Sequence, residues 1–363
     1  MLTLIEPLAS SVFAPGVPEL MQNFDSTNTE LSAFVVSVYV LGFAFGPMAL
    51  APMSEMWGRV PVYHTTNFIF LTFTVACAKA PSLDSLIVFR FFAGTFGAAP
   101  MTNGGGSIAD MFPAEERAGI MAIFTVGPLI GPIIDPVIGG FLADAEGWRW
   151  DFWLIVIVAG AISLTMLLTL KESYSPVILE RKVKRIRKET GDDRWYSKTD
   201  TGLSLKELFK KSIVRPINLL VFSPICTIFA FYLALVYGYI FHYMVAIIGL
   251  GFIGVGMCTL TFMWCSLTKA ENSLCNLISF MAICTYLVDA YELYAASALA
   301  ANIILRSIAG AFLSLCGRKM YNAMGLGWGN TLLGFIAVAL IPIPFLLLRY
   351  GEILRKKFEI GKL

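Results

Sequence analysis

The sequence predicts an all-α protein that crosses a membrane many times. Of its 363 residues, 57% are hydrophobic and 14% are charged, whereas soluble domains carry roughly 25% charged residues. The mean hydropathy is +0.73, and apolar runs of membrane-spanning length alternate with short charged segments along the chain. No separate soluble domain is visible in this pattern.

The apolar run from Phe124 to Trp153 shows the membrane character most clearly. Its Gly and Pro content would disrupt a soluble helix, because Pro removes a backbone donor and Gly costs conformational entropy. In a membrane, small residues let a neighbouring helix approach closely, and surrounding protein satisfies the backbone groups that Pro frees. We therefore expect close helix packing at Gly127, Pro128, Gly131, Pro132, Pro136, Gly139 and Gly140.

The first 170 residues predict one helical bundle. Its first apolar run, Leu2–Val17, is short for a span of about 20 residues and contains Glu6. Lys and Arg are scarce in the next loop, which indicates an outer face. The remaining helices are expected at Leu31–Pro52, Val62–Ala78, Leu83–Met101, Phe124–Trp153 and Phe152–Leu170.

Residues 171–212 predict a polar linker. The stretch Lys171–Lys211 holds twelve Lys/Arg and seven Asp/Glu, so the excess of positive charge places it in the cytoplasm. A tether between membrane helices explains this charge better than nucleic-acid binding does. Its basic centre, Leu179–Glu189, suits a surface of anionic lipid.

A second bundle is expected over 213–349, followed by a basic tail at 350–363. Its runs lie at 216–241, 242–265, 274–292, 294–316 and 328–349. Five crossings would put the linker and the tail on opposite sides, although both are basic. We therefore predict that the second and third runs form one broken span, or that one of them is re-entrant, so that the tail is cytoplasmic.

The sequence carries no pattern typical of an enzyme. The histidines and cysteines lack metal-ligand spacing, and Gly104–Gly106 follows no strand, so it does not predict a phosphate site. We expect no cofactor, no metal and no catalytic residue.

Charges inside the apolar runs are the candidate functional residues. Arg90 at membrane depth costs about 2.5–3.5 kcal/mol on insertion scales, so it faces the bundle interior or snorkels to the interface as an anchor. The acidic candidates are Asp135, Asp289 and Glu6, and Asp135 points from a Gly/Pro-rich helix that we expect to face the partner half of the chain. Burial in an apolar setting favours the protonated carboxyl, so such a group could bind a proton near neutral pH.

Several of these segments resemble the twelve-helix, fungal drug:proton antiporter branch of the major facilitator superfamily. The fifth-helix run resembles its Gly-Pro-x-x-Gly-Gly antiporter motif, with Asp135 in place of a Gly, and GWRW follows at Gly147–Trp150. Arg90, followed by Gly94 and Gly97, resembles its fourth-helix motif, in which the Arg is implicated in proton coupling.

Two charged loops also resemble family motifs. MSEMWGRVPV at Met53–Val62 resembles the loop between helices 2 and 3, and DMFPAEERAG at Asp110–Gly119 resembles the loop between helices 4 and 5. In the family the first loop latches the two halves and gates conformational exchange, and charges of the second can pair with it. The resemblance assigns this role to Glu55, Gly58, Arg59, Asp110, Glu115 and Arg117.

The resemblance implies two pseudo-symmetric helix bundles that rock around a midplane cavity and exchange protons for amphipathic organic compounds. It implies a monomeric protein of the plasma membrane or the vacuolar membrane, driven by the proton gradient. The candidates for proton coupling are Arg90, Asp135 and Asp289, although Asp135 could equally be a damaging change at a packing position.

The chain also departs from the family pattern. Half of helix 1 and helices 8 and 9 have no counterpart, and the run Cys258–Cys284 matches nothing in the family. We therefore expect about 10–11 spans with an incomplete second bundle. The alternative to an exporter is a truncated, non-transporting remnant of one.

Overall fold

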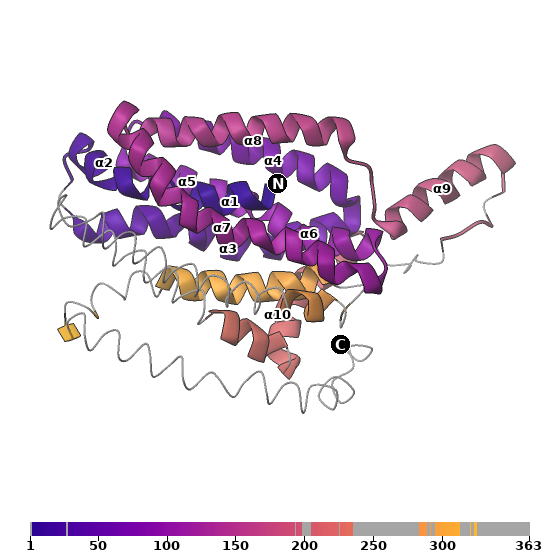
Figure 1. The fold of residues 1–363 in the computed structure, drawn as a ribbon. Coiled ribbons are helices and arrows are strands. Elements are labelled where there is room, and N and C mark those ends of the chain that lie inside the picture. Colours follow the sequence, from indigo (N-terminus) through magenta and orange to yellow (C-terminus); the bar gives the residue numbers. More distant parts are fainter. Residues whose placement is uncertain are drawn as a thin grey trace.

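The computed structural model describes residues 2–26, 28–192, 194–197, 205–224, 226–234, 283–288, 291, 295–312, 320 and 323–324. Within them the first half forms one bundle of roughly antiparallel helices (Figure 1). Its helices are α1 (Leu2–Ser11), α2 (Val17–Asn23), α3 (Thr29–Trp57), α4 (Arg59–Ala78), α5 (Leu83–Gly97), α6 (Ala99–Met111), α7 (Ala114–Glu146) and α8 (Arg149–Thr169). A short 3-10 helix, η1 (Ala14–Gly16), joins α1 to α2.

The charged loops are much shorter than the sequence predicts. Gly58 alone separates α3 from α4, with a φ of 100°, a region that glycine adopts readily. Only residues 112 and 113 separate α6 from α7. The predicted loops at 53–62 and 110–119 are therefore largely helical, because polar residues can continue a helix once it leaves the hydrocarbon.

Glycines allow α3 and α5 to pack closely in the bundle. A Cβ on Gly46 would lie 2.9 Å from the Ala98 Cβ and would collide with the Thr95 carbonyl oxygen, and one on Gly42 would lie 2.8 Å from the Thr95 nitrogen. From α5, Gly94 faces the backbone of Tyr39 in the same way. The backbones of α3 and α5 therefore touch directly, as small residues permit in membrane helices.

The Gly/Pro-rich helix α7 packs mainly on α1. A Cβ on Gly127 would lie 3.1 Å from the Leu4 nitrogen, and one on Gly131 would lie 2.9 Å from the Pro7 Cβ. Gly139 faces the Val12 carbonyl at even closer range. Gly140 has more room, Pro128 is buried, and the side chains of Pro132 and Pro136 lie outside the described residues.

The linker and the second half are described in part. The linker contains α9 (Ser175–Thr190), and α10 (Leu205–Phe222) begins before the expected boundary at 213. The expected helix at 216–241 is broken: the pieces Ser212–Phe222 and Cys226–Ala234 meet at 85°. A further helix, Ala295–Phe312, lies against the first half (Figure 1).

Four described helices are long and apolar enough to cross a membrane, or five if the bent pair counts as one span. They are Leu31–Trp57, Leu83–Met111, Arg149–Thr169 and Ala295–Phe312. Helix α5 and α6 together form the second of these spans. The other predicted spans of the second half, at 242–265 and 328–349, lie outside the described residues.

Candidate functional site

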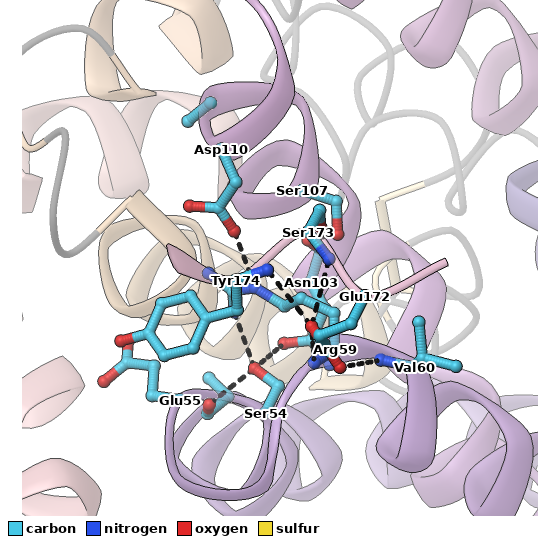
Figure 2. Close-up of polar contacts among 12 residues, drawn as sticks. Ser54, Glu55, Arg59, Val60, Asn103, Ser107, Asp110, Glu172, Ser173 and Tyr174 are labelled. Atoms are coloured by element: carbon cyan, nitrogen blue, oxygen red, sulfur yellow. Dashed lines mark hydrogen bonds and ion pairs between the residues drawn. The ribbon is translucent and has the colours of Figure 1, made fainter. Parts of the chain in front are cut away.

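A polar cluster centred on Arg59 joins four segments at the linker end of the bundle (Figure 2). The Arg59 side chain is 4% exposed, and its Nε lies 3.1 Å from Asp110 Oδ2 of α6. Its Nη1 donates to Ser54 Oγ at 2.7 Å, and Ser54 in turn donates to Asn103 Oδ1 at 2.9 Å. The predicted pair of Arg59 and Asp110 is therefore brought together, and it ties α3, α4 and α6 to one another.

Glu172 supplies the missing cap of α4. Gly58 precedes this helix and has no side chain to cap it, so the first backbone donors need another acceptor. Glu172 Oε1 accepts from the Arg59 nitrogen at 2.9 Å, and Oε2 accepts from the Val60 nitrogen at 3.2 Å. A carboxylate at this position also suits the positive end of the helix dipole. Glu172 thereby fixes the start of the linker to the start of α4.

We expect Glu172→Ala to destabilise the first bundle by about 1–2 kcal/mol, because two buried backbone donors lose a charged acceptor. Thermal unfolding of the purified protein measures this loss. The matched control is Glu180→Ala, which removes an exposed carboxylate paired only with Lys184 at 2.6 Å. Equal unfolding temperatures for the two variants would contradict the capping role.

Tyr174 covers the outer side of the Arg59 guanidinium. The Arg59 Cζ lies 4.8 Å from the centre of the Tyr174 ring, within the range of a cation–π contact. Burial and, next, the charge of Glu55 raise the pKa of the Tyr174 hydroxyl to about 12. The ring therefore stays neutral at physiological pH and shields Arg59 from water.

Glu55 connects the cluster to the second half of the chain. Its Oε2 lies 2.7 Å from Arg215 Nη1 of α10, and its Oε1 accepts from Ser297 Oγ at 3.0 Å. The Glu55 and Arg215 side chains are only 7% and 16% exposed. Glu55 thus forms a nearly dry polar contact with two separate segments of the second half.

Small residues surround this contact between the halves. Ala51 packs with Ala296 and Ala300, and a Cβ on Gly106 would lie 3.2 Å from the Ala296 Cβ. Gly105 faces Leu299 in the same way. Gly105 and Gly106 thus lie where the halves meet, whereas Gly104 faces Phe124 of α7. Such an interface permits close approach.

The second predicted loop contributes unequally to the site. Arg117 is buried and donates to the carbonyls of Phe112 and Ala109 at 3.0 and 3.1 Å, so it holds the end of α6. Glu115 is exposed, and the structure does not bring it to Arg59. Asp110 of this loop joins the polar cluster through its ion pair with Arg59.

Arg90 lies in the bundle interior, where it is 1% exposed. Its Nε donates to the Val35 carbonyl and its Nη2 to the Ser10 carbonyl, both at 3.0 Å. Its Cζ lies 3.9 Å from the Phe13 ring centre and 5.1 Å from that of Tyr39. The alternative of a snorkelling anchor is wrong, because the guanidinium is enclosed by α1, α3 and α5.

Asp135 faces a different neighbour from the one expected. It is 0% exposed, and its Oδ2 accepts a short hydrogen bond from Ser11 of α1. The expectation that it faces the partner half is therefore wrong: Gly131 and Gly139 seat this face of α7 on α1. Asp289, the third coupling candidate, lies outside the described residues.

Glu6 is a further enclosed carboxylate of α1. It is 3% exposed, and within the described part of the chain neither of its side-chain oxygens accepts a hydrogen bond. It lines a cavity of about 10 Å³, together with Asn67 and Phe70, which is about the space that one water molecule needs. A buried carboxylate without a hydrogen-bond partner is costly when ionised.

Sequence reasoning missed half of the polar cluster. Glu172, Arg215 and Ser297 are separated from their partners by 113, 160 and 242 positions, so no local spacing reveals the contacts. Among the described residues, no three His, Cys, Asp or Glu side chains are grouped as metal ligands would be. The arrangement joins the two halves of the chain through polar side chains that are nearly closed to water.

Curated relatives cover nearly the whole chain. The MFS-type transporter tndD of Aspergillus flavipes is 44% identical over 432 aligned positions, covering 99% of this chain and 80% of the relative. The efflux pump radE of Floropilus chiversii is 42% identical over 433 positions, again covering 99% of this chain and 80% of the relative. The alignments are longer than the 363-residue chain, so these relatives have segments without a counterpart here.

Solved structures share the fold. The proton:xylose symporter XylE, bound to 6-bromo-6-deoxy-D-glucose, has a TM-score of 0.60 at 16% identity and covers 93% of both chains. A human organic anion transporter has a TM-score of 0.54 at 13% identity, covering 94% of this chain and 97% of that one. The profile of the Major Facilitator Superfamily matches residues 1–342. The chain is therefore a multi-pass membrane transporter of the Major Facilitator Superfamily.

Proposed function

We propose that this transporter exports amphipathic organic compounds in exchange for protons, by alternating access between its two halves. The observation that carries the proposal is the contact of Glu55 with Arg215 and Ser297. It is nearly dry, it joins the halves at the linker end of the first bundle, and it is built from polar atoms that water can replace. Such a contact can close and reopen during a transport cycle.

This contact of Glu55 with Arg215 and Ser297, which we call the gate, lies on the cytoplasmic side in our proposal. It shares the bundle end from which the basic linker departs, through Glu172 and Tyr174, and positive segments stay in the cytoplasm. The conformation with the gate closed would then open toward the outside and release substrate there. The plasma membrane is the location that suits this direction of transport.

Proton coupling is supported by buried charges in the first bundle. Glu6 is a buried carboxylate of α1 that lines a cavity with Asn67 and Phe70 of α4. Asp135 of α7 is buried against α1, and Arg90 donates to the Ser10 carbonyl of α1. Ser11, one residue on, donates to Asp135. A change in the charge of Asp135 would therefore act on the same turn of α1 that Arg90 holds.

The proposed substrates are secondary metabolites or drugs of amphipathic character, carried by a monomeric protein. This class rests on the relatives, among which are an efflux pump and a transporter of a trichosetin biosynthesis cluster in Gibberella fujikuroi. The second candidate function is that of a non-transporting remnant. It is favoured by the segments that the relatives have and this chain lacks.

Expression in a yeast that lacks its own drug pumps tests the proposal. We expect the chain to lower the cellular content of a fluorescent amphipathic compound such as rhodamine 6G, and dissipation of the proton gradient to abolish this effect. A protein that reaches the plasma membrane but leaves the content unchanged would support the remnant instead.

Asp135→Asn tests the coupling role directly. The amide keeps the hydrogen bond with Ser11 but cannot bind and release a proton, so we expect export to lose its pH dependence and to fall at least about tenfold. Ser11→Ala is the companion variant, because it removes the hydrogen bond and leaves the carboxyl. Normal export with unaltered pH dependence in Asp135→Asn would rule out the role.

A further inference from the structure

One helix of the chain stands outside the membrane bundle. Helix α9 projects from the linker end of the bundle, and Val177 is its one buried residue (Figure 1). Most of the stability of a helix in a protein comes from packing of its apolar face, and α9 packs little of its surface on the bundle. Its stability therefore calls for a partner on its exposed faces.

The side chains of α9 separate into an apolar and a basic face. Leu179, Val183 and Ile186 follow one another at intervals of four and three residues, which places them on one side of the helix. Arg181, Lys184 and Lys188 recur at three and four residues and occupy the opposite side. The helix is thus amphipathic, with a strongly basic polar face.

The positive charge of α9 is only partly compensated within the helix. Of its six Lys/Arg, Lys184 pairs with Glu180 at 2.6 Å and Arg185 with Glu189 at 2.8 Å. Both pairs are exposed to water. In the part of the chain that the structure describes, Arg181, Lys182 and Lys188 form no ion pair. These three cations are therefore available to an anionic surface.

Two exposed aromatic residues lie beside the end of α9. Gly191, with a φ of 67°, ends the helix, and Arg187 Nε then donates to the Trp195 carbonyl at 2.6 Å. Trp195 and Tyr196 are 51% and 78% exposed. Trp and Tyr are enriched where a membrane meets water, because their rings are apolar and their edges are polar.

We propose that α9, together with Trp195 and Tyr196, is a membrane-surface element that binds anionic phospholipid headgroups of the cytoplasmic leaflet. A basic polar face, an apolar face and interfacial aromatics are the combination by which helices lie in a membrane surface. The cytoplasmic leaflet carries the matching negative charge. The proposal does not depend on transport, since a membrane-inserted remnant would bind lipid in the same way.

Binding of α9 to lipid would also act on the residues beside the gate. Tyr174, the residue that precedes α9, lies over the Arg59 guanidinium. Glu172, two residues earlier, caps α4. A helix held on the membrane surface therefore holds the segment that covers the Arg59 cluster.

Hydrogen–deuterium exchange of the full chain tests the proposal. The protein is placed in nanodiscs of phosphatidylcholine alone or of an equal mixture with phosphatidylserine. We expect exchange over residues 175–197 to slow several-fold in the mixed discs, and high salt to reverse this slowing. Peptides from α5, inside the bundle, provide the control and should exchange equally in both. Equal exchange over 175–197 in the two lipids would overturn the proposal.

Variants that change the charge of α9 provide a second test in the same exchange experiment. Each Lys or Arg near an anionic surface strengthens binding about fivefold, so the triple variant Arg181→Gln, Lys182→Gln, Lys188→Gln should weaken it about a hundredfold and lose the protection. The variant Glu180→Gln, Glu189→Gln keeps every cation and should gain protection. If the triple variant kept the phosphatidylserine effect, the basic face would not be the lipid-binding surface.

Discussion

Arg215→Gln is expected to lower export at least about tenfold while the protein remains folded. Removing one partner of a buried ion pair costs about 3–5 kcal/mol, because the other charge stays buried without compensation. Here that partner is Glu55, 7% exposed. The cost falls only on the conformation in which the halves meet at the cytoplasmic end, so the population of that state drops. Export of a fluorescent compound from pump-deficient cells measures the loss.

A double-mutant cycle separates this contact from other effects of the substitution. Glu55→Gln should also lower export, and the double variant Glu55→Gln, Arg215→Gln should fall no further than the worse single variant. The matched control is Arg194→Gln, which removes the cation of an ion pair with Asp192 whose arginine is 91% exposed. Additive losses in the double variant would show that the two residues act independently.

Arg90→Met is expected to fold normally and to lose export by about a hundredfold or more. A buried charge can often be replaced by an apolar residue of similar volume without loss of stability, and three aromatic rings already surround this side chain. The variant cannot bind the Ser10 and Val35 carbonyls, so α1 is no longer held at the turn whose Ser11 donates to Asp135. Export and thermal unfolding together measure the two effects.

Two companion variants sharpen this prediction. Arg90→Lys keeps the charge but not the geometry that reaches two carbonyls, so we expect an intermediate loss. Lys79→Met removes an exposed cation that lies 5.9 Å from the Trp153 ring, and it should export normally. Normal export by Arg90→Met would show that Arg90 contributes only to packing and not to transport.

The first bundle and its charged residues near Arg59 could be predicted because the sequence patterns that indicate them are local. Arg59 follows a glycine that the turn between α3 and α4 requires, and Arg90 stands alone in an apolar run. The apolar runs give the approximate centres of the helices. Their ends were predicted poorly, because charged residues that leave the bilayer, such as Glu55 and Asp110, continue helices rather than ending them.

The partners of these residues could not be predicted from the sequence. In the sequence, Glu172 is one of many charged residues of the linker, and only the fold shows that it caps the start of α4. Gly105 and Gly106 matter only because the helix Ala295–Phe312 packs on them. The orientation of Asp135 was mistaken for a related reason: the same glycines fit either neighbour, and only the packing of α7 on α1 decides between them.

Transport by the purified chain in proteoliposomes tests the central claim most directly. The vesicles are loaded at acidic pH and diluted into neutral buffer containing rhodamine 6G, so that protons leaving the lumen can drive the compound inward. We predict uptake that requires the pH gradient and that disappears in Arg90→Met. A folded protein that shows no gradient-dependent uptake of amphipathic compounds would contradict the claim, and the chain would be a non-transporting member of its family.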